Sequence, residues 1–394
     1  MRSFSIAMVA ACPFPANHGT PGLIREASQA ISALGHKVHV VTYPMGQDIP
    51  VQGLTIHRVS GILTPRRITV GPTYYKPFLD ALLVVKLCRV VAKEKIDIIH
   101  AHNYEGALAG YIAKKVTGRP MIYNAVNTMR DELPTYGFIR PKFLAIRFAA
   151  LLDNLVPRMG DHVIAISEDL HRDLLQKGIR TDRLSLVPAG VDAALFENKD
   201  PNVMRSRYKI GSRPLVVYTG TLDTFQRIDL LLIAMRLVID KIPEAMLLIA
   251  GNIIRASDLA QFSDLARELG IAPNVIFTDE RPLEEMPYFL ASADVAVAPR
   301  PSCPGFPIKL LNYMAAAKPI VVFHGSAKGL QDMHNAILVP DYDSQEYGRA
   351  ILRILQDPPL ALALGSHARQ TVQRTFDWPT LARKIERIYA ELGA

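Results

Sequence analysis

The sequence predicts an α/β protein made of two doubly wound domains, each built around a parallel sheet. Short apolar runs rich in β-branched residues alternate with segments of helical periodicity in both halves of the chain. This alternation is typical of strands that are buried on both faces of a sheet and joined by helices. The length of 394 residues also exceeds what one hydrophobic core usually supports.

The predicted elements follow one another in the same way in each half. A helix that ends at Gly35 follows the first strand. The predicted strands of the first half are 4–11, 37–43, 96–102, 120–126 and 162–167. Those of the second half are 214–220, 245–251, 274–279, 294–299 and 319–323.

The domain boundary is predicted where Pro188 and Gly190 interrupt this pattern. We expect a first domain at 1–188, completed by a C-terminal helix at 376–394, and a second domain at 189–375. Ligands of such domains bind beyond the carboxyl ends of the strands.

Charge is divided unevenly between the halves. Residues 1–190 contain 23 Lys and Arg against 14 Asp and Glu, a net charge of +9. Residues 191–394 contain 22 against 23, a net charge of −1. This asymmetry predicts that the first half meets an anionic surface or substrate.

The cysteines and the hydropathy point to a cytoplasmic protein. Cys12, Cys88 and Cys303 form no CxxC pair, which argues against a disulfide framework or a structural zinc. Cys303 has no base committed to it in the sequence, so we interpret it as a small loop residue and not as a nucleophile. No uncharged apolar run reaches the length of about 18 residues that a membrane-spanning helix needs.

The stretch at 299–321, "PRPSCPGFPIKLLNYMAAAKPIV", predicts an anion site at the start of a helix. We place Pro307 in the first turn, where its missing N–H costs nothing. Gly305 lets the backbone approach a ligand, and Lys309 adds a positive charge where a diphosphate would lie. Asn312 faces the same side of the helix as Lys309. The same helix also packs through its apolar residues, whether or not it binds a ligand.

Two common nucleotide-binding signatures are missing. The loop after the first strand, "ACPFPANHGT", has no GxGxxG motif, and no GxxxxGK[ST] motif occurs in the sequence. A dinucleotide-binding protein or a P-loop NTPase is therefore disfavoured.

A series of stretches in a fixed order carries a family resemblance: "PFPANHGT", "HAHNYEG", "YNAVNTMRDELP", "AISEDL", "VPAGVD", "YTGTLDTFQRIDLLL", "LLIAG", "ADVAVAPRP" and "PGFPIKLLNYMAAAKPIVV". Their order and spacing resemble the retaining GT-B glycosyltransferases of family four (glycosyl transferases group 1) across essentially the whole chain. The resemblance implies two facing Rossmann-like domains with a cleft between them. It also implies hexosyl transfer from a nucleotide-diphosphate sugar, with retention at the anomeric carbon, no cofactor and no metal.

The resemblance assigns roles to individual residues. Residues expected to bind the donor are His18, Gly19, Thr20, Gly220, Thr221, Gln226, Arg281, Pro282, Arg300, Pro304, Gly305, Phe306, Pro307 and Asn312. Residues expected to act in catalysis are Lys309, Arg227, His102 and Asn127. Residues expected on the acceptor side are Glu105, Tyr104 and Val126.

Several of these positions depart from the commonest family pattern. The two glutamates that often contact the sugar and the ribose are Pro304 and Asn312 here, as in a branch of the family without the usual pair. The basic pair that often holds the diphosphate is replaced by Thr221 and Gln226. A buried diphosphate without a cation would be costly. We therefore expect Lys309, Arg227 or Arg300 to contact it.

The acceptor side also lacks a usual polar group, because Val126 occupies the position of a family histidine. Asn127, or His102 and Glu105 from the loop that follows strand 96–102, are expected to replace it. We expect His100 and His102 to face opposite sides of that strand. The only DxD sequence, at 341–343, is interpreted as a turn.

The acceptor class is suggested by basic residues among apolar ones. Residues 62–95 contain seven Lys and Arg against two acids, and 140–158 places Leu144, Phe148, Leu151 and Leu155 at helical spacing. This pattern favours a peripheral enzyme that glycosylates a lipid-linked or cell-envelope acceptor at an anionic membrane surface. Ordinary core-facing helices with snorkelling cations are the alternative.

Other functions remain open. A catalytically silent nucleotide-sugar-binding protein or partner subunit would explain the departures listed above. A nucleotide-sugar epimerase would share the architecture, but its acid–base residues are not recognisable. Nucleic-acid binding has no dedicated motif.

Overall fold

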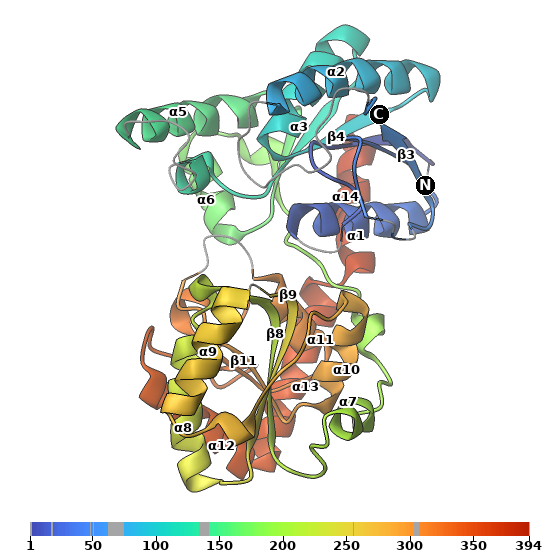
Figure 1. Cartoon of the computed structure of the whole chain (residues 1–394). Helices are drawn as coiled ribbons and strands as arrows, with labels where there is room; N and C mark the ends of the chain where they lie inside the picture. Colours follow the sequence, from blue (N-terminus) through green and yellow to red (C-terminus); the bar gives the residue numbers. More distant parts are fainter. Residues whose placement is uncertain are drawn as a thin grey trace. The chain divides into compact units, whose positions relative to one another are not determined.

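The computed structural model describes residues 2–16, 19–47, 49, 51–61, 75–133, 142–254, 256–302 and 307–393. They form two compact units (Figure 1), Met1–Gly190 with Trp378–Ala394 as unit 1 and Val191–Asp377 as unit 2. Each unit is a parallel sheet with helices on its faces, so the predicted pair of doubly wound domains is confirmed. The chain passes between the units at Gly190 and at Asp377, close to the predicted positions 188 and 375.

The sheet of unit 1 has seven parallel strands in the order β3-β2-β1-β4-β5-β6-β7. They are β1 (Ser5–Ala10), β2 (Lys37–Thr42), β3 (Leu54–Arg58), β4 (Ile98–His102), β5 (Met121–Ala125), β6 (His162–Ala165) and β7 (Leu184–Leu186). The edge strands β3 and β7 were not predicted from the sequence. Both are short and only partly buried, so they lack the continuous apolar run that marks an inner strand.

The helices of unit 1 cover both faces of this sheet. They are α1 (Gly19–Ala33), α2 (Lys76–Lys93), α3 (Asn103–Thr117), α4 (Met129–Glu132), α5 (Lys142–Leu155), α6 (Glu168–Gln176) and α14 (Trp378–Leu392). Right-handed crossovers place α2, α3, α5 and α6 on one face, because the strands that they join step in one direction along the sheet. The other face carries α1 and α14, where the indole N–H of Trp378 donates to Glu26 at 2.9 Å.

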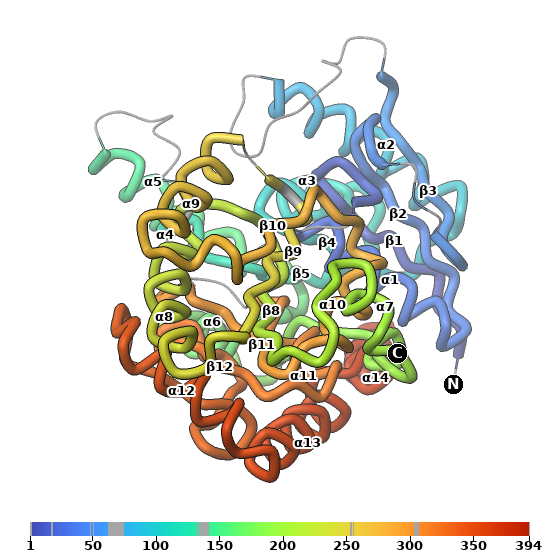
Figure 2. Tube along the Cα trace, turned by 60° about the horizontal axis from the view of Figure 1, so that its bottom comes forward, coloured from blue at the N-terminus to red at the C-terminus, as the bar shows by residue number. Residues whose placement is uncertain are grey.

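The sheet of unit 2 has six parallel strands in the order β10-β9-β8-β11-β12-β13. They are β8 (Leu215–Leu222), β9 (Met246–Ile254), β10 (Val275–Phe277), β11 (Val295–Ala298), β12 (Ile320–Phe323) and β13 (Ile337–Val339). The helices are α7 (Asn202–Arg207), α8 (Ile228–Lys241), α9 (Ala256–Glu268), α10 (Met286–Ser292), α11 (Ile308–Ala315), α12 (Ser344–Gln356) and α13 (Pro358–Thr375). The tube view traces the same elements from another side (Figure 2).

Strand order reverses at one point in each sheet, between β1 and β4 in unit 1 and between β8 and β11 in unit 2. Ligands of doubly wound sheets generally bind outside the carboxyl ends of the strands at such a point, because the loops that leave the two strands run in opposite directions.

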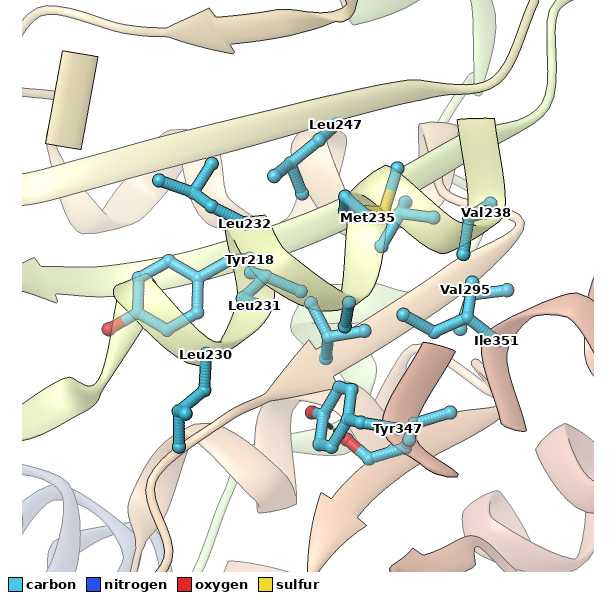
Figure 3. Close-up of a cluster of buried hydrophobic side chains, with 14 of the residues drawn as sticks. Tyr218, Leu230, Leu231, Leu232, Met235, Val238, Leu247, Val295, Tyr347 and Ile351 are labelled. Carbon is cyan, nitrogen blue, oxygen red and sulfur yellow. Dashed lines mark hydrogen bonds between the residues drawn. The ribbon is translucent and has the colours of Figure 1, made fainter. Parts of the chain in front are cut away.

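The core of unit 2 lies between α8, α12 and the sheet (Figure 3). Leu231 and Met235 of α8 are fully buried, and so is Tyr347 of α12. The Tyr347 hydroxyl donates to the carbonyl of Val321 at 2.7 Å, so the one polar atom of this large side chain is satisfied. The core thus fixes the strands whose ends form the site described below.

Two histidines are buried under α14 in unit 1. The rings of His100 and His102 are stacked, with centroids 4.7 Å apart and planes at 13°. The prediction that they face opposite sides of the strand is wrong, because residues two apart in a strand point to the same face. His100 Nδ1 lies 2.7 Å from the hydroxyl oxygen of Tyr389. Burial lowers the pKa of His100 to about 3 and the pKa of His102 well below its usual value.

These buried histidines predict a loss of stability in acid. The unfolded chain takes up a proton on His100 below pH 6.5, whereas the folded chain does so only near pH 3. Stability from this depressed pKa is complete above pH 6.5 and is lost as the pH falls. When the pH is lowered from 7 to 5, the free energy of unfolding should therefore fall by about 2 kcal/mol less in His100→Gln than in the wild type.

Urea unfolding followed by the fluorescence of Trp378, the only tryptophan, measures this in unit 1. His324→Gln is the matched control, because His324 is exposed. An equal fall in the free energy of unfolding between pH 7 and 5 in the wild type and in His100→Gln would contradict the prediction.

Candidate functional site

Lys309 lies at the centre of a polar network at the carboxyl end of β8. Its ammonium donates to the hydroxyl of Tyr218 at 2.8 Å and to Gln226 Oε1 at 2.9 Å. It also lies 4.2 Å from the centroid of the Tyr218 ring. Gln226 Nε2 donates in turn to the Thr221 hydroxyl at 3.2 Å. The structure therefore brings together three residues that the sequence analysis assigned to the donor: Lys309, Gln226 and Thr221.

Gly220 makes room for this ammonium. Its φ of +137° is a conformation that residues with a side chain rarely adopt. A Cβ atom at this position would lie 2.8 Å from Lys309 Nζ. A side chain at the predicted site residue Gly220 would thus take space that the Lys309 ammonium occupies.

Helix α11 is tied to the sheet one turn after Lys309. The Tyr313 hydroxyl accepts from the backbone N–H of Thr219 at 3.0 Å and lies 3.3 Å from the carbonyl of Val297. Burial raises the pKa of Tyr313 to about 12, so the hydroxyl stays protonated and neutral. These bonds join α11 to β8 and β11, the two strands at which the strand order reverses.

The start of α11 differs by one residue from the prediction. Pro307 does not lie in the first turn but precedes it, and its carbonyl accepts from the N–H of Leu310 at 2.9 Å. Lys309 is the second residue of the helix, and Asn312 is half-buried in its second turn. The predicted residues Pro304, Gly305 and Phe306 lie outside the described residues, as do Cys303 and His18.

The two arginines considered as alternative cations do not join the Lys309 network. Arg227 binds Asp229 through both Nε, at 2.9 Å, and Nη2, at 2.7 Å, and this pairing raises its pKa. Arg300 donates from Nε to the carbonyl of Ser302 at 2.6 Å, and its guanidinium lies 4.9 Å from the Phe225 ring. Of these three cations, Lys309 is therefore the one that the structure shows hydrogen-bonded to the predicted donor residue Gln226.

Arg281 and Pro282 lie in the segment that leads from β10 to α10. The backbone N–H of Arg281 donates to the carbonyl of Gly251 at 2.7 Å, which holds the loop after β10 against β9. The carbonyl of Pro282 accepts from the N–H of Glu285 at 3.1 Å. Both residues thus have fixed backbones at the same edge of the sheet as Lys309.

In unit 1, the predicted acceptor-side residues follow β4 and β5. Helix α3 begins directly after β4, so Glu105 stands in its first turn and not in a loop as predicted. Its carboxylate pairs with Lys76 at 3.3 Å. The Tyr104 hydroxyl lies 3.4 Å from the carbonyl of Asn127, which follows half-buried Val126. His102 is 2% exposed, and such burial does not favour contact with a substrate.

Gly19 and Thr20, the described part of the predicted glycine loop, are the first two residues of α1. Gly19 has a φ of +55°, in the left-handed region that favours glycine. Both residues follow β1, one of the two strands at which the strand order of unit 1 reverses.

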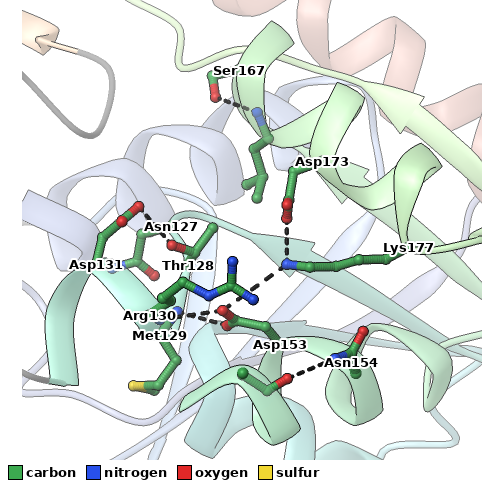
Figure 4. A network of polar contacts seen from close by, with 12 residues as sticks. Asn127, Thr128, Met129, Arg130, Asp131, Asp153, Asn154, Ser167, Asp173 and Lys177 are labelled. Atoms are coloured by element: carbon green, nitrogen blue, oxygen red, sulfur yellow. Dashed lines mark hydrogen bonds and ion pairs between the residues drawn. The ribbon is translucent and has the colours of Figure 1, made fainter. Parts of the chain in front are cut away.

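A buried aspartate fixes the segment next to Asn127 (Figure 4). Asp153 accepts from the backbone N–H groups of Met129 at 2.7 Å and Arg130 at 3.2 Å, and from the Tyr104 hydroxyl at 2.5 Å. Its carboxylate also lies 4.0 Å from the ammonium of Lys177. The first turn of α4 is thereby held at the end of β5.

Asp153 and Tyr218 were missed by the sequence analysis, although each holds a predicted site residue or its neighbour. The available signal was a polar residue in a largely apolar stretch, "RFAALLDNL" for Asp153 and "PLVVYTG" for Tyr218. Such a residue is either exposed or paired with a partner far away in sequence. The sequence alone does not name that partner.

Nothing in the described part of the chain resembles a metal cage or a membrane span. No three His, Cys, Asp or Glu side chains of these residues gather closely enough to hold a metal ion. Asp341 accepts from the N–H of Gly325 at 2.8 Å, and Asp343 accepts from the N–H of Glu346 at 2.9 Å. Among the described helices, none has both the length and the hydropathy to cross a bilayer.

Two family models match the chain. Residues 18–190 match a glycosyl transferase 4-like domain, and residues 213–357 match glycosyl transferases group 1. A D-inositol 3-phosphate glycosyltransferase of Thermobispora bispora is 25% identical to this chain, over 93% of this chain and 88% of its own length.

Solved structures resemble the whole chain. Sucrose-phosphate synthase from Thermosynechococcus elongatus has a TM-score of 0.78 and 21% identity, with 99% of each chain covered. Anabaena Alr3699/HepE in complex with UDP has a TM-score of 0.75 and 17% identity, with 98% of this chain and 100% of that one covered. HepE has also been solved with UDP-glucose.

The buried Asp153 yields a prediction about stability. Asp153→Ala removes the acceptor of the Arg130 N–H and the 2.5 Å acceptor of the Tyr104 hydroxyl, and it leaves the Met129 N–H with the Tyr104 oxygen, at 3.1 Å, as its acceptor. We expect the free energy of unfolding of unit 1 to fall by about 3 kcal/mol. Urea unfolding followed by Trp378 fluorescence measures the change. The adjacent Asn154→Ala is the matched control, because Asn154 is exposed, and similar losses in both variants would refute the role of Asp153.

Proposed function

Because this chain belongs to the GT-B glycosyltransferases of family four, we propose that it moves a sugar from a nucleotide-diphosphate sugar to an acceptor hydroxyl. Transfer retains the configuration of the anomeric carbon and needs no metal ion. The observation that carries the proposal is the Lys309 network at the point where the strand order of unit 2 reverses.

Lys309 is suited to bind the diphosphate of the donor. Its ammonium lies in the first turn of α11, where the N-terminal N–H groups add partial positive charge. Two of the groups that hold it, Tyr218 and Gln226, are neutral acceptors. A diphosphate placed there would meet a full charge and oriented dipoles together. Lys309 would thereby neutralise the diphosphate, as the basic pair often does in family members whose positions are occupied here by Thr221 and Gln226.

In the proposed reaction, the bond between the anomeric carbon and the diphosphate oxygen breaks. The acceptor oxygen forms its bond to the same face of the carbon, and the acceptor proton passes to the leaving diphosphate. Lys309 stabilises the negative charge that grows on the leaving group, which is electrostatic catalysis. Asn312 binds the ribose, and the backbone at Arg281 and Pro282 contacts the base.

The donor and acceptor classes follow from similar proteins and from charge. Similar structures are solved with UDP or UDP-glucose, so uridine nucleotides are the first to test. Residues 1–190, with a net charge of +9, suit a lipid-linked or cell-envelope acceptor at the cytoplasmic face of a membrane. The D-inositol 3-phosphate glycosyltransferases that resemble the chain suggest a second acceptor class, a phosphorylated polyol.

A catalytically silent nucleotide-sugar-binding protein is the second candidate function. It is motivated by the changes at Val126, Pro304, Thr221 and Gln226, where the family more often has a histidine, a glutamate and two basic residues. The two functions differ in one result, since a silent protein binds the donor but neither hydrolyses nor transfers it.

A thermal-shift screen over nucleoside diphosphates and nucleotide-sugars tests donor binding, because a ligand of the native state raises its melting temperature. Transfer to lipid-linked acceptors, inositol phosphates and water is then measured with the donor that binds. Donor binding without turnover on any of them would favour the silent protein. If no nucleotide shifts the melting temperature, the proposed donor site is wrong.

The role of Lys309 is tested by Lys309→Ala. Loss of a preorganised cation beside the leaving group should lower kcat by about 100-fold to 1000-fold. The melting temperature should change little, because the buried Tyr218 hydroxyl keeps its hydrogen bond to the carbonyl of Thr221 at 2.8 Å and alanine is a good helix former. Lys241→Ala, at an exposed position in the last turn of α8, is the control. Wild-type kcat in Lys309→Ala would remove Lys309 from the site.

A further inference from the structure

Helix α5 presents its large apolar side chains outward. The residues that it buries are Ala145, Ala149 and Asp153, spaced four apart. A stripe of Leu144, Phe148, Leu151 and Leu155 is 44–51% exposed. An ordinary surface helix has the reverse arrangement, with its large apolar residues facing the core.

Helix α3 shows the same inversion. It packs on the sheet through glycine and alanine, and a Cβ at Gly110 would lie 2.7 Å from Met121 Sδ and 3.1 Å from the Cβ of Ala101. Its exposed large residues, Leu108, Ile112 and Val116, are spaced four apart on the outer side. Val116 is 69% exposed.

Helix α2 continues this face with Phe78 and Val85, which are 43% and 49% exposed. It packs beside α3, and both lie on the same face of the sheet as α5 (Figure 1). Of the 18 exposed large hydrophobic residues of the described chain, 12 lie on these three helices or at the residue before α2. We call the outer sides of α2, α3 and α5 the apolar face.

The charges on the apolar face all have one sign. The exposed ionisable residues of these three described helices are Arg89, Lys93, Lys115, Lys142 and Arg147. Their three acids are not exposed, and each has a partner. Asp80 accepts from the Tyr43 hydroxyl, Glu105 pairs with Lys76, and Asp153 accepts from the Tyr104 hydroxyl.

We propose that the apolar face binds the surface of a lipid bilayer that contains anionic phospholipids. Large apolar side chains enter the boundary between headgroups and acyl chains, while the surrounding cations attract the headgroups. A second copy of this chain is a poor occupant, because two cationic faces would repel each other. The inference deepens the proposed function, since it rests on the proposal of a lipid-linked acceptor and names the surface that would reach it.

Co-sedimentation of the full chain with vesicles tests the proposal. Vesicles of equal parts phosphatidylcholine and phosphatidylglycerol should bind the protein at low salt, and vesicles of phosphatidylcholine alone should bind it at least ~10-fold less. Raising the salt to ~0.5 M should weaken binding, because the ions screen the attraction of the cations to the headgroups.

Two variants of the apolar face separate its contributions. Leu144→Ser/Phe148→Ser/Leu151→Ser should lower vesicle binding at least ~10-fold, because it removes the side chains that would insert. Lys142→Glu/Arg147→Glu should lower binding to the anionic vesicles alone. All five residues are exposed, so the melting temperature should stay near that of the wild type. Leu362→Ser in unit 2 and Arg383→Glu on α14 are exposed control positions and should bind as the wild type does.

Several results would overturn the proposal. One is a wild-type protein that stays in the supernatant with anionic vesicles at low salt. Another is equal binding by the apolar-face variants and the controls. A dimer in size-exclusion chromatography with light scattering, lost in the triple serine variant, would assign the face to a second copy. Binding that requires an added acidic protein would assign it to that partner.

Vesicle binding is measured without donor or acceptor, so it is independent of the catalytic proposal. If the protein binds vesicles but no nucleotide-sugar shifts its melting temperature, the proposed donor site fails and the membrane face stands. If the protein binds and turns over nucleotide-sugars but does not bind vesicles, the proposed donor site stands and the membrane face fails.

Discussion

The contact between the first turn of α11 and the end of β8 is the interaction on which the candidate donor site depends. Lys309 reaches Tyr218 and Gln226, and Tyr313 ties the next turn to the backbone of β8 and β11. A lysine side chain in water samples many rotamers, and ordering it costs free energy at the moment of binding. Here the Lys309 side chain is ordered when the protein folds, so the ammonium is already in place for an anionic ligand. Gly220 is part of the same constraint, since any larger residue would take the space of Lys309 Nζ.

In unit 1, a buried carboxylate holds the segment of the predicted acceptor side in place. The end of β5 leads to Asn127 and to α4, a helix of four residues that is too short to be stable alone. Asp153 caps it from α5 and accepts the Tyr104 hydroxyl from α3, so one carboxylate joins three elements. Such a group is expensive to bury unless it is paired and hydrogen-bonded. Asp153 accepts three hydrogen bonds and lies 4.0 Å from the Lys177 ammonium, and the segment near Asn127 gains a fixed backbone.

The sequence predicted what depends on local pattern and failed where the structure depends on distant partners. Inner strands were recognisable because burial on both faces gives continuous apolar runs, whereas β3, β7 and β13 were missed. Thr221, Gln226 and Lys309 were assigned to the donor site from the family resemblance and the chemistry of a helix start, and the structure brings them together. Arg227, however, adopts a left-handed conformation and pairs with Asp229 two residues on. The periodicity of the sequence does not reveal such a backbone conformation or such a side-chain pairing. Tyr218 and Lys309 are 91 residues apart, so only the fold shows that the hydroxyl holds the ammonium.

The inverted helices of unit 1 follow from how they pack. Glycine and alanine on the inner side of α3 let the helix approach β4 and β5 closely, and nothing bulky is needed there. The outward-facing large residues of α3 and α5 therefore stay 40–69% exposed, although full burial of such a side chain is worth about 1.5–3 kcal/mol relative to full exposure. Polar residues would serve the same fold without exposing apolar surface to water. These side chains have a function if they enter an apolar environment other than the core of their own unit. The five exposed cations around them, without an exposed acid on the same helices, limit that environment to a negatively charged one.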